Sequence, residues 1–163
     1  MTEGTLKHAE AREIVARIEE RRVVVLPDAL FGQLSSVVHG VGMLLLVEKI
    51  DAGLPARVAE TCVILDGVQD AGNVGSILRS AAAAGIARVF CAPGTAYAWS
   101  SKVLRSGMGA HFLLDIFEDV ELGDLIARLD APVTIPQPGG MESLNVAATA
   151  AICLFEQCRQ QRG

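Results

Sequence analysis

Short apolar runs alternate with amphipathic segments over the second half of the chain. The apolar runs occupy residues 61–65, 88–91, 112–116 and 132–136, and their length is typical of buried strands in a parallel sheet. The segments between them have apolar positions at helical spacing, and another such segment ends the chain. Strands that alternate with helices in this way predict an α/β fold with an open, mostly parallel sheet.

Cap and turn residues mark the ends of the predicted helices. Asn73 is the candidate N-cap of the first helix, and Gly85 is placed to end it in the left-handed conformation. Serines at positions 100 and 101 are suited to cap the second helix. In the last helix, one face carries Val146, Ala150, Cys153 and Leu154.

The first fifty residues have a separate pattern. It predicts a helix over residues 9–20, a strand over 23–26, a short helix over 28–34 and a second strand over 43–47. Gly and Pro in the next ten residues indicate a linker. The chain is therefore divided into a small α/β domain (1–50), a linker (51–60) and a larger domain (61–163).

Charge and cysteine usage exclude several classes of protein. With 14 basic against 19 acidic residues, the formal net charge of −5 excludes a protein that coats nucleic acid by bulk charge. The four cysteines form no CxxC pair and lie near no histidine at metal-ligand spacing, so no metal site is expected. Reduced cysteines and the absence of a signal-peptide pattern favour the cytoplasm. Residues 29–47 are uncharged, but polar residues and glycines interrupt them, so no membrane span is expected.

One region has the opposite charge to the rest of the chain. Residues 71–114 contain no acidic residue and four basic ones, which are Arg79, Arg88, Lys102 and Arg105. Lys102 and Arg105 are three positions apart and share a helix face. A phosphate-bearing polyanion such as RNA is one interpretation of this surface, and a solvated helix face is the other. Trp99 is a candidate for stacking on a base or, equally, for packing in the core.

Three loops follow the predicted strands, at the sheet edge where open α/β proteins bind ligands. They span residues 66–76, 92–101 and 136–143 and are rich in glycine. None matches a nucleotide-binding fingerprint, so tight connections between elements are the favoured explanation of the glycines. Asp70 is interpreted as a cap or turn residue, and His111 as a structural residue.

Three segments resemble a known family. Residues 70–81 (DAGNVGSILRSA) resemble motif 1 of the SpoU (TrmH-type) RNA ribose 2′-O-methyltransferases of the SPOUT superfamily. Residues 101–110 (SKVLRSGMGA) resemble the segment that follows it, and residues 135–147 (IPQPGGMESLNVA) resemble motif 3. Residues 1–50 are similar to part of the RNA-binding domain that often precedes the catalytic domain. Three ordered motifs are far more specific than one glycine-rich loop.

The resemblance implies a fold, a reaction and a site. It implies a C-terminal trefoil knot, S-adenosylmethionine bound in that knot, a homodimer, and methyl transfer to a ribose 2′-hydroxyl of tRNA or rRNA. The catalytic residues it implies are Arg79, Asn73, Ser143 and Asn145. The cofactor contacts it implies are Ile135, Met141, Ser143, Leu144 and Asn145. The RNA contacts it implies are Arg79, Lys102 and Arg105.

One segment of the family pattern is absent. The family carries motif 2, a strand followed by a G-x-E-G-x-G loop, between the equivalents of Leu129 and Val133. Two interpretations stay open: the sequence omits a segment that the protein carries, or the protein has lost it. The second interpretation favours an alternative function, a non-catalytic RNA-binding or assembly factor on the same scaffold.

Overall fold

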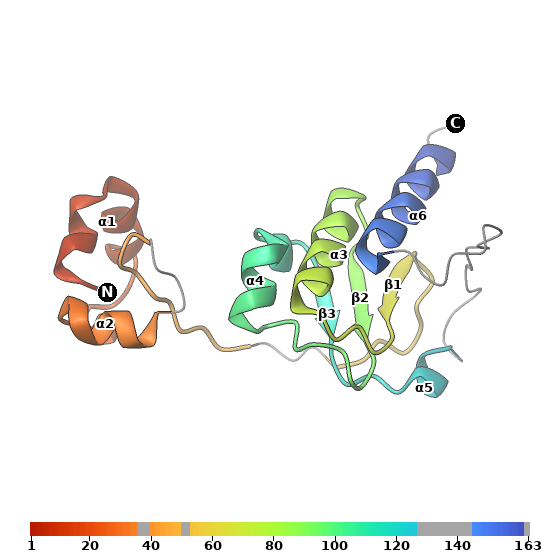
Figure 1. The fold of residues 1–163 in the computed structure, drawn as a ribbon, viewed down its shortest axis with the longest axis horizontal. Coiled ribbons are helices and arrows are strands. Elements are labelled where there is room, and N and C mark those ends of the chain that lie inside the picture. The colour runs from red at the N-terminus through yellow and green to blue at the C-terminus, as the bar shows by residue number, and fades with distance from the viewer. Residues whose placement is uncertain (36–39, 50–52, 127–144, 162–163) are drawn as a thin grey trace. The chain divides into compact units, whose positions relative to one another are not determined.

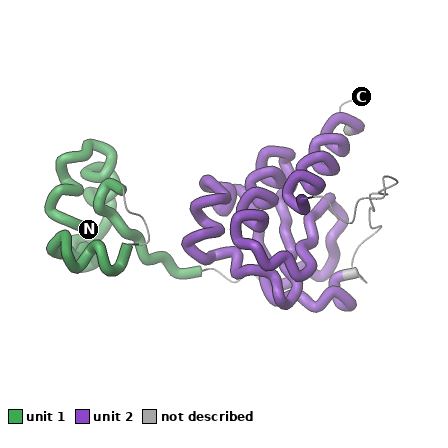
Figure 2. The backbone as a smooth tube through the Cα atoms, in the orientation of Figure 1, with its two compact units in different colours: residues 1–50 green, residues 51–163 purple. Residues whose placement is uncertain are grey.

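The computed structural model describes residues 1–35, 40–49, 53–126 and 145–161 (Figure 1). The chain divides into two compact units, Met1–Ile50 and Asp51–Gly163, which are coloured separately in Figure 2. Among the described residues, no helix combines the length and the hydrophobicity needed to span a bilayer.

A parallel sheet forms the centre of the second unit (Figure 1). Its three strands are β1 (Cys62–Leu65), β2 (Arg88–Cys91) and β3 (Asp115–Phe117), in the order β1-β2-β3. Cys62 pairs with Arg88, and Arg88 pairs in turn with Asp115. The predicted α/β fold with a parallel sheet is therefore confirmed. The fourth predicted strand, at 132–136, lies outside the described residues.

Helices connect these strands and cover the sheet. They are α3 (Ala71–Ala83) between β1 and β2, α4 (Ser101–Gly107) between β2 and β3, α5 (Leu122–Ile126) after β3, and α6 (Val146–Gln161). Right-handed crossovers that advance in one direction along a sheet place their helices on the same face. In agreement with this rule, α3 packs against α4, and it also packs against α6.

Successive side chains along each strand point to opposite faces of the sheet, and they contribute to two hydrophobic clusters, one on each face. Val89 and Cys91 of β2 belong to the larger cluster, which includes buried residues of α3. Phe90, between them, belongs to the smaller cluster and stacks on Phe117 with ring centroids 4.9 Å apart. The pleat of β2 thus distributes three consecutive side chains between the two faces.

The ends of α3 follow from its cap residues, with one correction. Asp70 is the N-cap, and its side chain accepts a hydrogen bond from the backbone N–H of Asn73. Asn73, predicted as the cap, is instead the third residue of the helix. At the other end, Gly85 (φ +76°) donates to Ala82 O and Ile86 donates to Ala81 O, the paired bonds of a Schellman motif. The predicted helix end at Gly85 is confirmed.

Two other sequence predictions need correction in this unit. The third strand begins three residues later than predicted, because a 3-10 turn, η3 (Ala110–Phe112), precedes it. Phe112 is consequently 93% exposed instead of buried in a strand. In α6, Ala147, Ala150 and Leu154 face the core, whereas Val146, predicted on that face, is 39% exposed.

The first unit is helical in its described residues. Its helices are α1 (Ala9–Val15) and α2 (Asp28–Leu34), with 3-10 turns η1 (Glu3–Lys7) and η2 (Glu20–Arg22). The prediction of α2 is confirmed, but α1 is shorter than the predicted 9–20. The strands predicted over 23–26 and 43–47 are wrong, since these described residues form no β-ladder. An apolar run forms a strand only when another strand pairs with it. The run over 43–47 is unpaired and mostly exposed, and Leu46 within it is 99% exposed.

Candidate functional site

The first turn of α3 lies at the carboxyl-terminal edge of the sheet and is organised by Asp70. Its Oδ1 atom accepts the Asn73 backbone N–H over 2.8 Å, and its Oδ2 atom lies 3.6 Å from Lys102 Nζ of α4. The hydrogen bond from Asn73, followed by the charge of Lys102, lowers the pKa of the Asp70 carboxyl below its ordinary value. One carboxylate therefore caps α3 and also joins it to α4.

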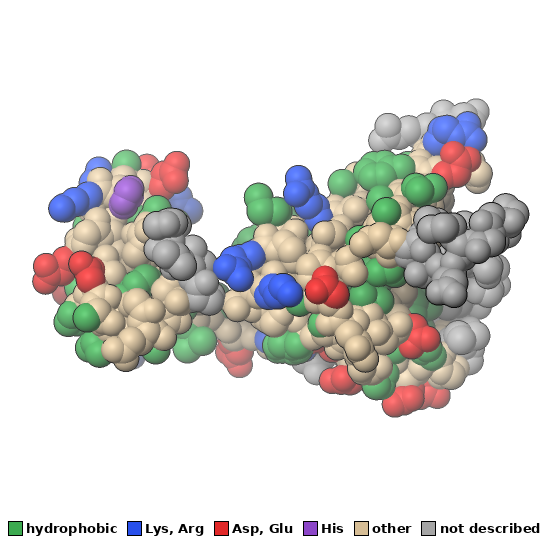
Figure 3. Space-filling view, in the orientation of Figure 1, with side chains coloured by type: hydrophobic (Ala, Val, Ile, Leu, Met, Phe, Trp, Pro, Cys, Tyr) green, Lys and Arg blue, Asp and Glu red, His purple; other side chains and the backbone are tan. Residues whose placement is uncertain are grey.

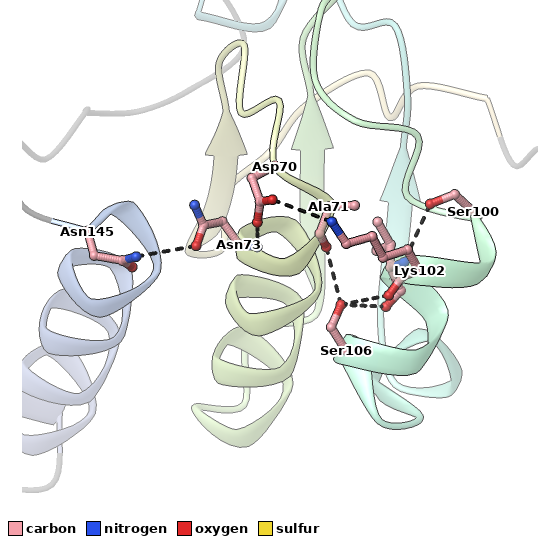
Figure 4. A network of polar contacts seen from close by, with 8 residues as sticks. Asp70, Ala71, Asn73, Ser100, Lys102, Ser106 and Asn145 are labelled. Atoms are coloured by element: carbon pink, nitrogen blue, oxygen red, sulfur yellow. Dashed lines mark hydrogen bonds and ion pairs between the residues drawn. The ribbon is translucent and has the colours of Figure 1, made fainter. Parts of the chain in front are cut away.

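Asn145 approaches the same turn from the start of α6, and Figure 4 shows its side chain directed toward Asn73. Asn145 Nδ2 donates to Asn73 Oδ1 over 3.4 Å. Asn145 Oδ1 accepts the backbone N–H groups of Ala147 and Ala148 over 3.0 and 3.2 Å, which caps α6. Two residues assigned to the catalytic site by different motifs are thus in contact.

Close packing against α3 holds α4 in place. The Ser106 hydroxyl lies 3.2 Å from the carbonyl oxygen of Ala71 and 3.0 Å from that of Lys102, both possible acceptors (Figure 4). A Cβ atom on Gly75 would lie 1.8 Å from Ser106 Oγ and 2.8 Å from the backbone nitrogen of Gly107. Only glycine therefore fits at position 75. Neither Ser106 nor Gly75 is among the site residues predicted from the sequence, although a glycine inside a helical pattern was an available signal.

The basic residues lie on the helices that border this turn. Arg79 is exposed on α3, six residues after Asn73, which is roughly 9 Å along the axis and about 120° around it. Lys102 and Arg105 are exposed on α4. Figure 3 shows lysine and arginine side chains over α4 on the face displayed. No hydrogen bond or ion pair joins Arg79 to another described residue, so its guanidinium group is open to a ligand.

The aromatic and histidine candidates beside the site are structural. Trp99 is half-buried and packs against the larger cluster. His111 is buried and its ring lies 5.1 Å from that of Trp99, between centroids. Because Ala98 O, 2.8 Å from His111 Nε2, can only accept, Nε2 carries the proton and donates. The structural interpretation of His111 is supported, and Trp99 is packed.

Most residues assigned to the cofactor belong to a part of the chain that the structure does not describe. Ile135, Met141, Ser143 and Leu144 lie outside the described residues, and Asn145 alone of that set is described. The carboxamide of Asn145 is occupied by the cap of α6 and by Asn73. In the part of the chain that the structure describes, Asn145 therefore orders the start of α6 beside α3.

Comparison with known proteins also finds similarity to RNA methyltransferases. Residues 60–131 match the SpoU rRNA Methylase family. The mitochondrial rRNA methyltransferase 3A of Danio rerio is 49% identical over 73 residues, which are 45% of this chain and 17% of that protein. The 23S rRNA (guanosine(2553)-2′-O)-methyltransferase RlmP of Bacillus subtilis is 43% identical over 142 residues, covering 60% of this chain and 57% of the relative. This chain thus spans less than two thirds of either relative.

The Bacillus alignment also differs in length between the two proteins. The alignment is 142 residues long, but it covers only 60% of this 163-residue chain, which is fewer than 142 residues. The relative therefore has residues inside the aligned region that this chain lacks. The family pattern likewise has a motif 2 that is absent from this sequence.

The fold has counterparts among solved structures. The SpoU methyltransferase AviRb of Streptomyces viridochromogenes, solved in complex with AdoMet, superposes with a TM-score of 0.75 at 22% identity. The match covers 96% of this chain and 79% of AviRb. The AdoMet-bound rRNA methyltransferase of Sinorhizobium meliloti gives a TM-score of 0.51 at 26% identity, over 61% of this chain and 56% of that one. Over residues 60–131 this chain is similar to the SpoU rRNA Methylase family, and its second unit shares the fold of solved SpoU methyltransferases.

Proposed function

We propose that this protein is an S-adenosylmethionine-dependent RNA methyltransferase that acts on a ribose 2′-hydroxyl of tRNA or rRNA. The observation that carries the proposal is the contact between Asn73 of motif 1 and Asn145 of motif 3 at the edge of the parallel sheet. The names of the relatives, which are rRNA methyltransferases and include a 2′-O-methyltransferase, support the reaction and the substrate class. AdoMet-bound neighbours of the same fold support the cofactor.

The residues of this chain have distinct roles in the proposed reaction. S-adenosylmethionine supplies the methyl group when it is bound. Asn73 and Asn145, with Ser143, line the reacting centre, while Ile135, Met141 and Leu144 hold the cofactor. Positioning of the hydroxyl relative to the methyl group contributes much of the rate in such a transfer. Arg79 stabilises the negative charge that develops on the 2′-oxygen, because a guanidinium group stays protonated and donates hydrogen bonds without acting as a base.

The proposal extends to the assembly of the enzyme. Lys102 and Arg105 contact the phosphates of the RNA, and the first unit adds to substrate binding. A trefoil knot in the second unit and a homodimer complete the site, and the protein acts in the cytoplasm. The resemblance to the SpoU family supports the knot, the homodimer and the RNA contacts, and the free cysteines support the cytoplasm.

A transfer assay tests the function. The purified protein is incubated with methyl-labelled S-adenosylmethionine and bulk RNA from cells that lack modification, and the RNA is then digested to nucleosides. Label in 2′-O-methylated nucleosides is the expected result. Label confined to bases, or no label in RNA while the cofactor binds, contradicts the proposal.

A second candidate function is RNA binding without transfer. The observation that favours it is the region of the Bacillus relative that has no counterpart in this chain. Calorimetry separates the two functions: RNA binding without any binding of S-adenosylmethionine supports the second.

A further inference from the structure

The exposed side of α4 combines apolar and basic side chains. Leu104 of α4 is 41% exposed, and Met108, the residue that follows the helix, is 71% exposed. Arg105 lies between them in sequence. Beyond the helix, Phe112 is 93% and Leu113 is 70% exposed. We call these five residues the α4 surface: Leu104, Arg105, Met108, Phe112 and Leu113.

Backbone geometry explains why Phe112 points into solvent. Met108 (φ 49°) and Gly109 (φ 87°) are both left-handed, and this turns the chain sharply at the end of α4. The next residues form η3, in which Ala110 and His111 are buried. Phe112 and Leu113 follow on the outer side. The exposed ring is therefore a product of an ordered turn that is anchored by a buried histidine.

The charge around the α4 surface indicates what binds it. No acidic residue occurs between positions 71 and 114, and of the four basic residues there, Lys102 and Arg105 lie on α4, whereas Arg88 lies in β2 and pairs with Glu60. The adjacent carboxylate, Asp70, is already paired with Lys102. Figure 3 shows hydrophobic and basic side chains next to each other over α4. An exposed aromatic ring that follows a helix with exposed cations is complementary to a polyanion that also offers flat apolar faces, which is the chemistry of unpaired RNA.

We propose that Phe112 stacks on an unpaired base of the RNA substrate while Arg105 and Lys102 contact the neighbouring phosphates. The proposal rests on the proposed function, because it assumes that RNA is the substrate. It adds that the recognised segment is single-stranded, since a base inside a duplex has no face free for the Phe112 ring.

Three substitutions at one position test the stacking. Phe112→Ala and Phe112→Leu remove the ring, whereas Phe112→Trp keeps an aromatic face. Binding of a short labelled single-stranded RNA is measured by fluorescence anisotropy without cofactor, next to the same strand annealed to its complement. We expect Phe112→Ala and Phe112→Leu each to weaken single-strand binding by about fivefold or more, with Phe112→Trp close to wild type. Binding of the duplex stays unchanged.

The control is Phe155→Ala, which removes another exposed phenylalanine (51% exposed) from α6 and should leave RNA affinity unchanged. Equal affinity of wild type and Phe112→Ala for the single strand overturns the proposal, as does full retention of affinity by Phe112→Leu. A change in oligomeric state of Phe112→Ala in light scattering also overturns it, because the surface is then an interface between copies. These binding results are independent of methyl transfer, so failure here is distinguishable from failure of the proposed function.

Discussion

Asn145 donates from its side-chain nitrogen to Asn73 Oδ1 over 3.4 Å, and this contact joins residues that are 72 positions apart in the chain. The same Asn145 side chain caps α6 through its oxygen. The nitrogen of this carboxamide therefore contacts Asn73, while its oxygen caps α6. This division allows the cap and the contact between motifs to be removed independently.

Asn145→Asp keeps a cap oxygen but loses the donor to Asn73, whereas Asn145→Ala loses both. We expect Asn145→Ala to lower the free energy of unfolding by about 1 kcal/mol, the typical effect of losing an N-cap. Asn145→Asp should keep nearly wild-type stability and still lose most methyl transfer. Thermal unfolding followed by circular dichroism, together with the transfer assay, checks both. Full activity of Asn145→Asp would show that the contact with Asn73 is dispensable.

Arg79→Ala should abolish methyl transfer and leave S-adenosylmethionine binding nearly intact, because in the proposed function the guanidinium group acts on the RNA hydroxyl or its phosphate. Single-turnover transfer and calorimetry with the cofactor measure the two effects. Arg159→Ala is the matched control, since Arg159 is an exposed arginine on α6 that pairs with Glu156. Equal loss of cofactor binding and transfer in Arg79→Ala contradicts the assigned role.

The Asp70 carboxylate predicts a specific acid sensitivity. Its pKa is lowered in the folded protein, chiefly by the Asn73 N–H, so the charged form stabilises the fold. This contribution is fully present above the unfolded pKa, near pH 4, and is lost as the pH falls through the lower folded pKa. The melting temperature of wild type should therefore fall more steeply with acidification below about pH 4 than that of Asp70→Asn. Parallel melting curves for the two proteins would refute this.

Gly75→Ala should disrupt the packing of α3 on α4. The new Cβ atom would lie 2.7 Å from Ser106 Cβ and 2.8 Å from the Gly107 backbone nitrogen, so truncating Ser106 cannot relieve the overlap. We expect a loss of about 2–3 kcal/mol, the cost of overpacking a close contact. Urea unfolding measures it. Gly123→Ala, whose Cβ meets no atom within 4 Å, is the control and should be neutral or slightly stabilising.

Met108→Gly should stabilise the protein. Met108 adopts a left-handed conformation (φ 49°), which costs a residue with a side chain about 1–2 kcal/mol. Glycine avoids this cost, but it offsets part of the gain because it loses more conformational entropy on folding. A net gain of about 0.5–1 kcal/mol is expected in urea unfolding. Gly109→Ala, at φ 87°, should have the opposite effect. A destabilised Met108→Gly would mean that its side chain makes a contact worth more than the strain.

The sequence predicted the second unit well where local and global signals agree. Apolar runs at residues 61 and 88 became β1 and β2, and Gly85 ended α3, because strand pattern and cap chemistry act over a few neighbouring residues. The first unit was predicted less well. The apolar runs over 23–26 and 43–47 have the composition of strands, but a strand also needs a partner edge, which lies elsewhere in the chain.

For the candidate site, the sequence indicated which residues are involved, whereas the structure showed which of them are in contact. Periodicity and charge were sufficient to predict the α/β class and the basic stretch. The catalytic roles that the ordered motifs imply for Asn73 and Arg79 stay predictions. Only the tertiary structure decided that Asp70 pairs with Lys102, that Asn145 reaches Asn73, and that Phe112 leaves the core. The physical reason is range: cap and strand preferences are local, whereas these contacts depend on how α3, α4 and α6 pack together.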